Sequence, residues 1–302
     1  MKKIDMRGII VPILTPMNED ESVNEGELRS QVRRMIDAGI HGIFAFGTNG
    51  EGYALSDAEK ERVLTAVVDE VRGRVPVYAG TGCITTADTV RLSRRAQELG
   101  ADALSIVAPF YAAASQDELY DHYIAVAEAV DLPIVLYNIP PRTGNALAPA
   151  TVARLARDAR NIAGAKDSSG NFDNLKQYIE LTSGLDKDFS VLSGNDALIL
   201  PGLVFGGRGG IAGCANVFPH TMAEIYEAFA AGDLKRAMRV QDSIRTFRNC
   251  FKYGNPNTII KIATGLLGYP VGSCRRPFCR LSDEGMKALK EALERCRENG
   301  LH

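Results

Sequence analysis

Several features that mark particular classes of protein are missing from this sequence of 302 residues. Its six cysteines include no Cys-x-x-Cys pair and its four histidines show no metal-ligand spacing, which disfavours a disulfide framework, a zinc site and metal-dependent chemistry. A net charge of −2 gives no electrostatic case for binding nucleic acid or an anionic membrane. The first apolar run is interrupted by Pro12 and Pro16, which predicts neither a signal peptide nor a membrane span. We therefore expect a cytoplasmic protein with free thiols and no metal.

What the sequence does contain is a regular alternation of short apolar runs with segments of helical period. The runs predict eight strands, at 8–15, 43–46, 75–79, 103–107, 133–137, 162–166, 189–192 and 210–215. Ser56 and Glu59 have the spacing of a capping box and predict the start of one of the intervening helices. After Gly232 the strand pattern stops, and three helices are predicted at 234–251, 258–267 and 283–297.

Eight strand–helix units of roughly 20–35 residues each predict an α/β protein with a (β/α)₈ TIM barrel, a fold of about 250 residues. The strands scarcely alternate between apolar and polar residues, as expected for a parallel sheet buried on both faces. A doubly wound open sheet is the alternative, but no G-x-G-x-x-G follows the first strand. We predict a catalytic barrel over residues 1–232 and a C-terminal helical extension over residues 233–302, packed on the barrel without a linker.

The reactive groups of a TIM barrel lie at the C-terminal ends of its strands. Here these ends carry Thr48, Tyr111, Tyr137, Arg142 and Lys166. A lysine is costly to bury as an ammonium, and a neutral amine can form a Schiff base with a ketone. Tyrosine can move protons, and arginine can grip a carboxylate through two hydrogen bonds. Each residue type alone is more often structural or solvated, so it is the set that predicts carbonyl chemistry.

Four motifs, in this order along the chain, resemble those of the dihydrodipicolinate synthase / N-acetylneuraminate lyase family. They are GTNGE at 47–51, YNIPPRTG at 137–144, GAKDSSGN at 164–171 and GIAGCANV at 210–217. Asn255-Pro256, Lys261 and Arg276-Pro277 are similar to the C-terminal helices of the family. The resemblance runs over nearly the whole chain, and the ordered set is far more specific than any one motif.

The resemblance implies a pyruvate-dependent class I aldolase whose only covalent intermediate is an imine on Lys166, with no cofactor. Tyr137 would relay protons near the iminium, with Thr48 bonded to its hydroxyl, and Tyr111 would complete this relay from a neighbouring subunit. Further substrate contacts would come from the backbone N–H groups of Thr48 and Asn49 at the pyruvate carboxylate, from Gly194 and Ile211 in the pyruvate pocket, and from Arg142 at the carboxylate of aspartate semialdehyde. The family's assembly implies a homotetramer, a dimer of dimers.

The family contains several activities, and different residues of this sequence favour different ones. Arg142 and Tyr111 favour the synthase branch, which condenses pyruvate with aspartate semialdehyde in lysine biosynthesis. Asn49 in place of a threonine, and Phe110 in place of a tyrosine, leave open an aldolase for a 2-keto-3-deoxy sugar acid, 4-hydroxy-2-oxoglutarate or N-acetylneuraminate. A barrel that only binds a keto acid is the alternative of another class. Cys83 replaces a residue of the family's allosteric lysine site, so we expect no inhibition by lysine.

Overall fold

The computed structural model describes residues 4–302, whose eight strands form a closed parallel barrel in the order β1-β2-β3-β4-β5-β6-β7-β8. The strands are β1 (Gly8–Pro12), β2 (Gly42–Ala45), β3 (Val77–Ala79), β4 (Ala103–Val107), β5 (Ile134–Asn138), β6 (Ile162–Asp167), β7 (Ser190–Ser193) and β8 (Gly209–Ile211). The predicted TIM barrel is confirmed. Met1 to Lys3, the first residues of the segment in which we predict no signal peptide, lie outside the described residues.

The chain divides into two compact units, residues 4–8 with 76–211 and residues 9–75 with 212–302. The helices of the first unit are α3 (Thr86–Glu98), α4 (Gln116–Ala129), α5 (Pro140–Thr143), α6 (Pro149–Asp158), α7 (Phe172–Thr182), η1 (Asp196–Leu198) and α8 (Ile199–Val204). Those of the second are α1 (Glu25–Asp37), α2 (Asp57–Val71), η2 (Gly213–Asn216), α9 (Pro219–Ala230), α10 (Leu234–Ser243), α11 (Arg245–Arg248), η3 (Asn249–Tyr253), α12 (Pro256–Leu266) and α13 (Asp283–Glu298).

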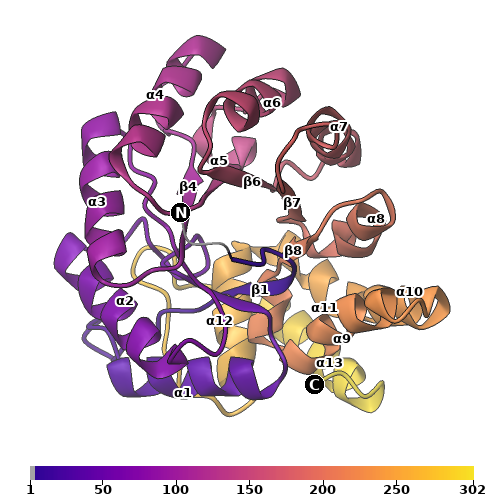
Figure 1. Cartoon of the computed structure of the whole chain (residues 1–302). Coiled ribbons are helices and arrows are strands. Elements are labelled where there is room, and N and C mark those ends of the chain that lie inside the picture. The colour runs from indigo at the N-terminus through magenta and orange to yellow at the C-terminus, as the bar shows by residue number, and fades with distance from the viewer. Residues whose placement is uncertain (1–3) are drawn as a thin grey trace. The chain divides into compact units, whose positions relative to one another are not determined.

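In the first unit, buried parallel strands lie inside a row of helices. β5 is buried along its whole length, as its apolar, non-alternating sequence predicts. Figure 1 shows α3, α4, α6 and α7 following one another outside the strands, and consecutive helices of this row are in contact. Tyr123 and Tyr178 are fully buried here, and their hydroxyls donate to the carbonyls of Ile106 and Leu147. These bonds satisfy two phenols that burial would otherwise leave without acceptors.

In the second unit, α1 and α2 lie side by side (Figure 1). Helix α2 begins with the predicted capping box, because the Ser56 side chain accepts from the Glu59 N–H and the Glu59 carboxylate accepts from the Ser56 N–H. The predicted helix 234–251 is wrong in its continuity, since α10, α11 and η3 divide this stretch. No helix in the described part of the chain combines the length and apolar character that crossing a membrane requires.

The predicted eighth strand, 210–215, is also wrong at its C-terminal end, because the strand stops at Ile211 and the chain turns into η2. The Asn216 side chain accounts for this. Its Oδ1 accepts from the Leu14 N–H and its Nδ2 donates to the Pro12 carbonyl, which ties the turn to the residues around the end of β1. A side chain that satisfies backbone groups in this way competes with continuation of the strand. The predicted boundary at residue 232 stays a prediction.

Candidate active site

Lys166 and Tyr137 lie next to each other on neighbouring strands of the first unit. The register of β5 and β6 pairs Tyr137 with Lys166, and the Lys166 Nζ lies 3.8 Å from the centroid of the Tyr137 ring. Each residue is only 3% exposed. The strand extends one residue beyond Lys166, to Asp167. The structure therefore brings together the predicted nucleophile and the predicted proton relay, away from bulk water.

Gly194 lies against the Lys166 side chain. A Cβ at this position would lie 2.9 Å from the Lys166 Cε and 1.9 Å from the Ser168 Oγ. Any side chain would therefore displace both residues, so glycine is what lets the Lys166 and Ser168 side chains lie this close to the backbone at position 194. The Gly194 N–H donates to the Asp167 carbonyl at 2.7 Å, which fixes the loop after β7 against the end of β6. Gly194 thus lies beside Lys166, and its place in a pyruvate pocket stays a prediction.

The residue after the lysine, Asp167, holds the end of β6 in place through neutral donors. Its buried carboxylate accepts from the Asn138 Nδ2 at 2.8 Å, the Ser169 Oγ at 2.7 Å and the Asn174 Nδ2 at 3.1 Å. Asn138 is the register partner of Asp167, as Tyr137 is of Lys166. The bond between their side chains therefore reinforces the strand pairing that sets Lys166 beside Tyr137. This role was not predicted from the sequence, although the Asp-Ser-Ser-Gly run is a recognisable turn signal.

Arg142, Tyr111 and Ile211 also belong to the first unit, and they differ in exposure. Ile211 ends β8 and is buried, whereas Arg142, on the short helix α5, is exposed. Tyr111 is 96% exposed, with a left-handed φ of 79°, so its side chain does not pack against Lys166 within the same chain. The Asn145 side chain holds its loop, because it donates to the Pro109 and Ala112 carbonyls and accepts from the N–H of residue 114. Asn145 is a second residue that sequence reasoning missed.

Thr48 and Asn49 belong to the second unit and lie in the turn after β2. The Thr48 carbonyl accepts from the Asn257 Nδ2 at 2.5 Å. The Asn49 Nδ2 is buried and has no hydrogen-bond acceptor among residues 4–302. It lies 2.7 Å from the point that a Cβ of Gly213 would occupy, so the glycine makes room for the amide. A buried donor without an acceptor is costly unless a ligand supplies one, which suits a residue predicted to bind substrate.

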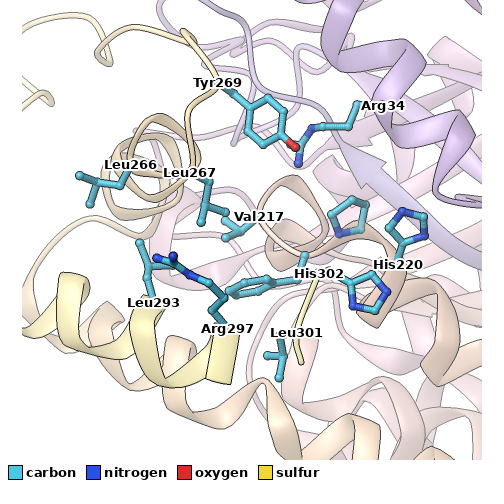
Figure 2. Close-up of a pocket in the computed structure, with 12 residues that line it drawn as sticks. Arg34, Val217, His220, Leu266, Leu267, Tyr269, Leu293, Arg297, Leu301 and His302 are labelled. Atoms are coloured by element: carbon cyan, nitrogen blue, oxygen red, sulfur yellow. The ribbon is translucent and has the colours of Figure 1, made fainter. Parts of the chain in front are cut away.

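A cavity of about 550 Å³ lies elsewhere in the second unit (Figure 2). Arg34, Tyr269, Leu267 and Arg297 are among the residues that line it, and none of the predicted site residues does. The Arg34 guanidinium stacks on the Tyr269 ring at 4.0 Å and donates to the Gln31 side chain and the Asn216 carbonyl. Arg34 therefore has structural partners. Within residues 4–302, no three His, Cys, Asp or Glu side chains cluster as metal ligands.

The sequence profile of the dihydrodipicolinate synthetase family matches residues 5–296. A 4-hydroxy-tetrahydrodipicolinate synthase from Methanopyrus kandleri is 41% identical over 292 residues, which cover 96% of each protein. Among solved structures, a dihydrodipicolinate synthase from Acinetobacter baumannii in complex with pyruvate is 34% identical, with a TM-score of 0.93, covering 97% of this chain and 99% of that one.

A second solved structure, YagE from Escherichia coli K12, is a prophage protein of the dihydrodipicolinic acid synthase family in complex with pyruvate. It is 30% identical, with a TM-score of 0.93, and the alignment covers 97% of this chain and 99% of that one. These similarities extend over nearly the full length of each protein, and they confirm the predicted class of enzyme, a lyase of the class I aldolase type. The chain belongs to the dihydrodipicolinate synthetase family.

Proposed function

We propose that this chain is a 4-hydroxy-tetrahydrodipicolinate synthase, which condenses pyruvate with aspartate semialdehyde through an imine on Lys166. The observation that carries the proposal is the buried Lys166 amine, 3.8 Å from the centroid of the Tyr137 ring, packed against the backbone of Gly194. A nucleophilic amine next to a phenol is the arrangement that imine formation and proton transfer require. The near-absence of solvent exposure also protects an imine from premature hydrolysis.

The reaction balances without a cofactor. The Lys166 Nζ attacks C2 of pyruvate and water leaves, which gives an iminium. Loss of a methyl proton forms the enamine, whose C3 attacks the aldehyde carbon of the second substrate, and the aldehyde oxygen takes up a proton. The amine of aspartate semialdehyde then attacks C2, closes the ring and displaces Lys166. One water is released for each pair of substrates, and Tyr137 would carry the protons.

The remaining site residues take the roles that the family resemblance implies. Thr48 and Asn49 would present backbone N–H groups to the pyruvate carboxylate. Arg142 is exposed and would bind the carboxylate of aspartate semialdehyde through a bidentate contact. Ile211, buried at the end of β8, would line the pyruvate pocket.

The proposed assembly is a homotetramer in which Tyr111 completes the proton relay of a neighbouring subunit. Its support is the 96% exposure of Tyr111 in the single chain, combined with a left-handed backbone that Asn145 holds from both sides. A large aromatic side chain exposed on a loop whose backbone is held in place suits burial against a partner. Light scattering tests the assembly directly. The cytoplasmic location and the absence of inhibition by lysine stay predictions.

One observation favours a second candidate function, an aldolase for a 2-keto-3-deoxy sugar acid, 4-hydroxy-2-oxoglutarate or N-acetylneuraminate. The Asn49 amide stands where we expect a threonine hydroxyl in the synthases, and its buried Nδ2 offers a donor that can hold a substrate oxygen. A site built around a buried donor discriminates strongly between substrates that satisfy it and those that do not.

A panel assay decides between these functions. Condensation of pyruvate with aspartate semialdehyde is measured beside cleavage of the three classes of keto acid. Arg142→Ala is compared with Arg154→Ala, which removes an exposed arginine of the same unit that pairs with Asp117. The synthase assignment predicts that Arg142→Ala raises the KM for aspartate semialdehyde about tenfold or more, the equivalent of about 1.4 kcal/mol, with the KM for pyruvate unchanged. Cleavage of a keto-deoxy acid without any condensation activity would overturn it.

A further inference from the structure

We propose that Asn257, Lys261 and Glu51 are positioning residues that fix the turn carrying Thr48 and Asn49. The inference rests on the proposed function, in which this turn binds the carboxylate of the keto acid. It assigns a role in substrate binding to α12, a helix of the C-terminal region. The three residues and all their contacts described below lie within the second unit.

Helix α12 holds both ends of the turn. Asn257 and Lys261 are four residues apart, so they lie on the same face of the helix. The Asn257 Nδ2 donates to the Thr48 carbonyl at 2.5 Å, and the Lys261 Nζ donates to the Glu51 carboxylate at 2.6 Å. One helix face therefore sets the separation and orientation of the first and last residues of the segment Thr48–Glu51.

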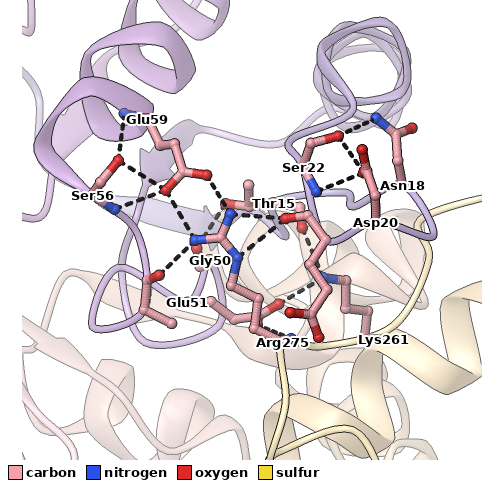
Figure 3. Close-up of polar contacts among 12 residues, drawn as sticks. Thr15, Asn18, Asp20, Ser22, Gly50, Glu51, Ser56, Glu59, Lys261 and Arg275 are labelled. Carbon is pink, nitrogen blue, oxygen red and sulfur yellow. Dashed lines mark hydrogen bonds and ion pairs between the residues drawn. The ribbon is translucent and has the colours of Figure 1, made fainter.

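The contact at Glu51 is an ion pair with Lys261 (Figure 3). Both side chains are 0% exposed, so the pair is fully buried. The second carboxylate oxygen of Glu51 accepts from the Arg275 N–H at 2.8 Å. The Lys261 Nζ also donates to the Thr15 carbonyl at 2.8 Å, and the Thr15 hydroxyl donates to the Gly50 carbonyl at 2.7 Å. Each buried charge thus has several partners, which is the condition under which such a pair persists in a protein interior.

The backbone of the turn needs this support. Glu51 has a left-handed φ of 56°, and Phe46, just before the turn, has a φ of 40°. Residues other than glycine adopt such values at a cost, and the conformation persists only where the surrounding contacts determine it fully. Such strained residues cluster at functional sites. The ion pair and the Asn257 bond therefore hold a strained turn in one conformation.

If the turn positions N–H groups for a carboxylate, release of its ends weakens keto-acid binding and leaves the amine chemistry of the first unit intact. The readout is borohydride trapping of the imine on Lys166, measured against pyruvate concentration. This titration does not depend on the identity of the aldehyde. Asn257→Ala and the double variant Glu51→Leu/Lys261→Met are the test proteins, since the double variant leaves no buried charge unpaired.

We expect the pyruvate concentration for half-maximal trapping to rise about tenfold or more in each test protein. The trapped fraction at saturating pyruvate should stay near the wild-type level. Glu70→Gln is the control, because Glu70 forms a half-buried ion pair with Arg33 in the same unit, and its other ion pairs among residues 4–302 are with Arg29 and Arg74, outside the turn. This control should keep the wild-type pyruvate dependence.

An unchanged pyruvate dependence in folded Asn257→Ala and in the double variant would overturn the inference and leave the proposed function standing. A fall in melting temperature without a change in the pyruvate concentration needed for half-maximal trapping would also overturn the inference, since it reports a structural role alone. Failure of the wild-type protein to form any adduct on Lys166 would instead overturn the proposed function, together with the inference that rests on it.

Discussion

Two buried carboxylates, one in each unit, hold the segments that carry the predicted site residues, and they do so by different means. Asp167, beside Lys166, accepts from the neutral donors of Asn138, Ser169 and Asn174. Glu51, in the turn after β2, accepts from the ammonium of Lys261 and one backbone N–H. Neutral donors fix the position of Asp167 without introducing another charge. The ion pair of Glu51 joins segments 210 residues apart in sequence, at the risk of leaving a buried charge if one partner is lost.

The largest expected effect comes from breaking the ion pair on one side only. Lys261→Met removes the ammonium and leaves Glu51 as a buried carboxylate without its ionic partner. We expect the free energy of unfolding to fall by about 3–5 kcal/mol, whereas the double variant Glu51→Leu/Lys261→Met stays within about 2 kcal/mol of wild type. Urea denaturation followed by circular dichroism measures both. Equal losses in the single and double variants would show that the pair does not behave as a coupled unit.

The next largest effect is a difference between the two units in the pH range over which each loses stability. Burial lowers the pKa of His122 to about 4, and its Nε2 has no hydrogen-bond partner among residues 4–302. The unfolded chain, with a histidine pKa near 6.5, takes up the proton first as the pH falls. The stability contributed by neutral His122 is therefore complete above pH 6.5 and is lost progressively down to pH 4. The total is about 3 kcal/mol, from roughly 1.4 kcal/mol for each unit of pKa.

In the second unit, the hydrogen bond from Arg275 lowers the pKa of Glu59 to about 2. The folding stability that the ionised Glu59 contributes is therefore lost only as the pH falls from 4.5 towards 2. Hydrogen exchange at several pH values should show the first unit opening before the second. His122→Gln should remove the loss between pH 6.5 and 4, and His220→Gln, at an exposed histidine, should keep it. An unaltered pH profile in His122→Gln would contradict the assignment.

A smaller effect is expected from Asp167→Asn. An amide keeps one acceptor oxygen but turns an NH₂ group towards donors that need an acceptor. We therefore expect the free energy of unfolding to fall by about 1–3 kcal/mol. Because Asp167 supports the strand pair that carries Lys166 and Tyr137, the rate of imine trapping should also fall. Thermal unfolding and borohydride trapping are measured on the same variant. A stable variant with wild-type trapping would show that the carboxylate plays no part in placing the lysine.

The smallest effect compares two capping boxes of the same composition. Ser56 and Glu59 begin α2 in the second unit, and Ser115 and Glu118 begin α4 in the first. Each Ser→Ala change should cost about 0.5–2 kcal/mol. The cost should be larger at Ser115, because Arg275 still holds the Glu59 carboxylate when Ser56 is changed. Chemical denaturation of both variants measures the two costs in unfolding free energy. A clearly larger cost for Ser56→Ala than for Ser115→Ala would contradict this prediction.

The two carboxylates also show what the sequence can predict. The contacts of Asp167 involve residues within 29 positions in the chain, and the motif that contains it identifies Lys166 directly. Glu51 and Lys261 both appear in motifs of the family, but their pairing depends on the tertiary fold. The strands were predictable because parallel strands buried on both faces give continuous apolar runs. The end of β8 was not, because the distant Asn216 contacts that end it leave no local signal.

The central claim is that Lys166 is the amine that forms an imine with pyruvate, and borohydride reduction tests it most directly. The wild-type protein is incubated with pyruvate, reduced and digested, and the modified peptide is identified by mass spectrometry. We predict one reduced adduct, on the Nζ of Lys166, and none in Lys166→Ala under the same conditions. An adduct on another lysine, or no adduct in the wild-type protein, would contradict the account.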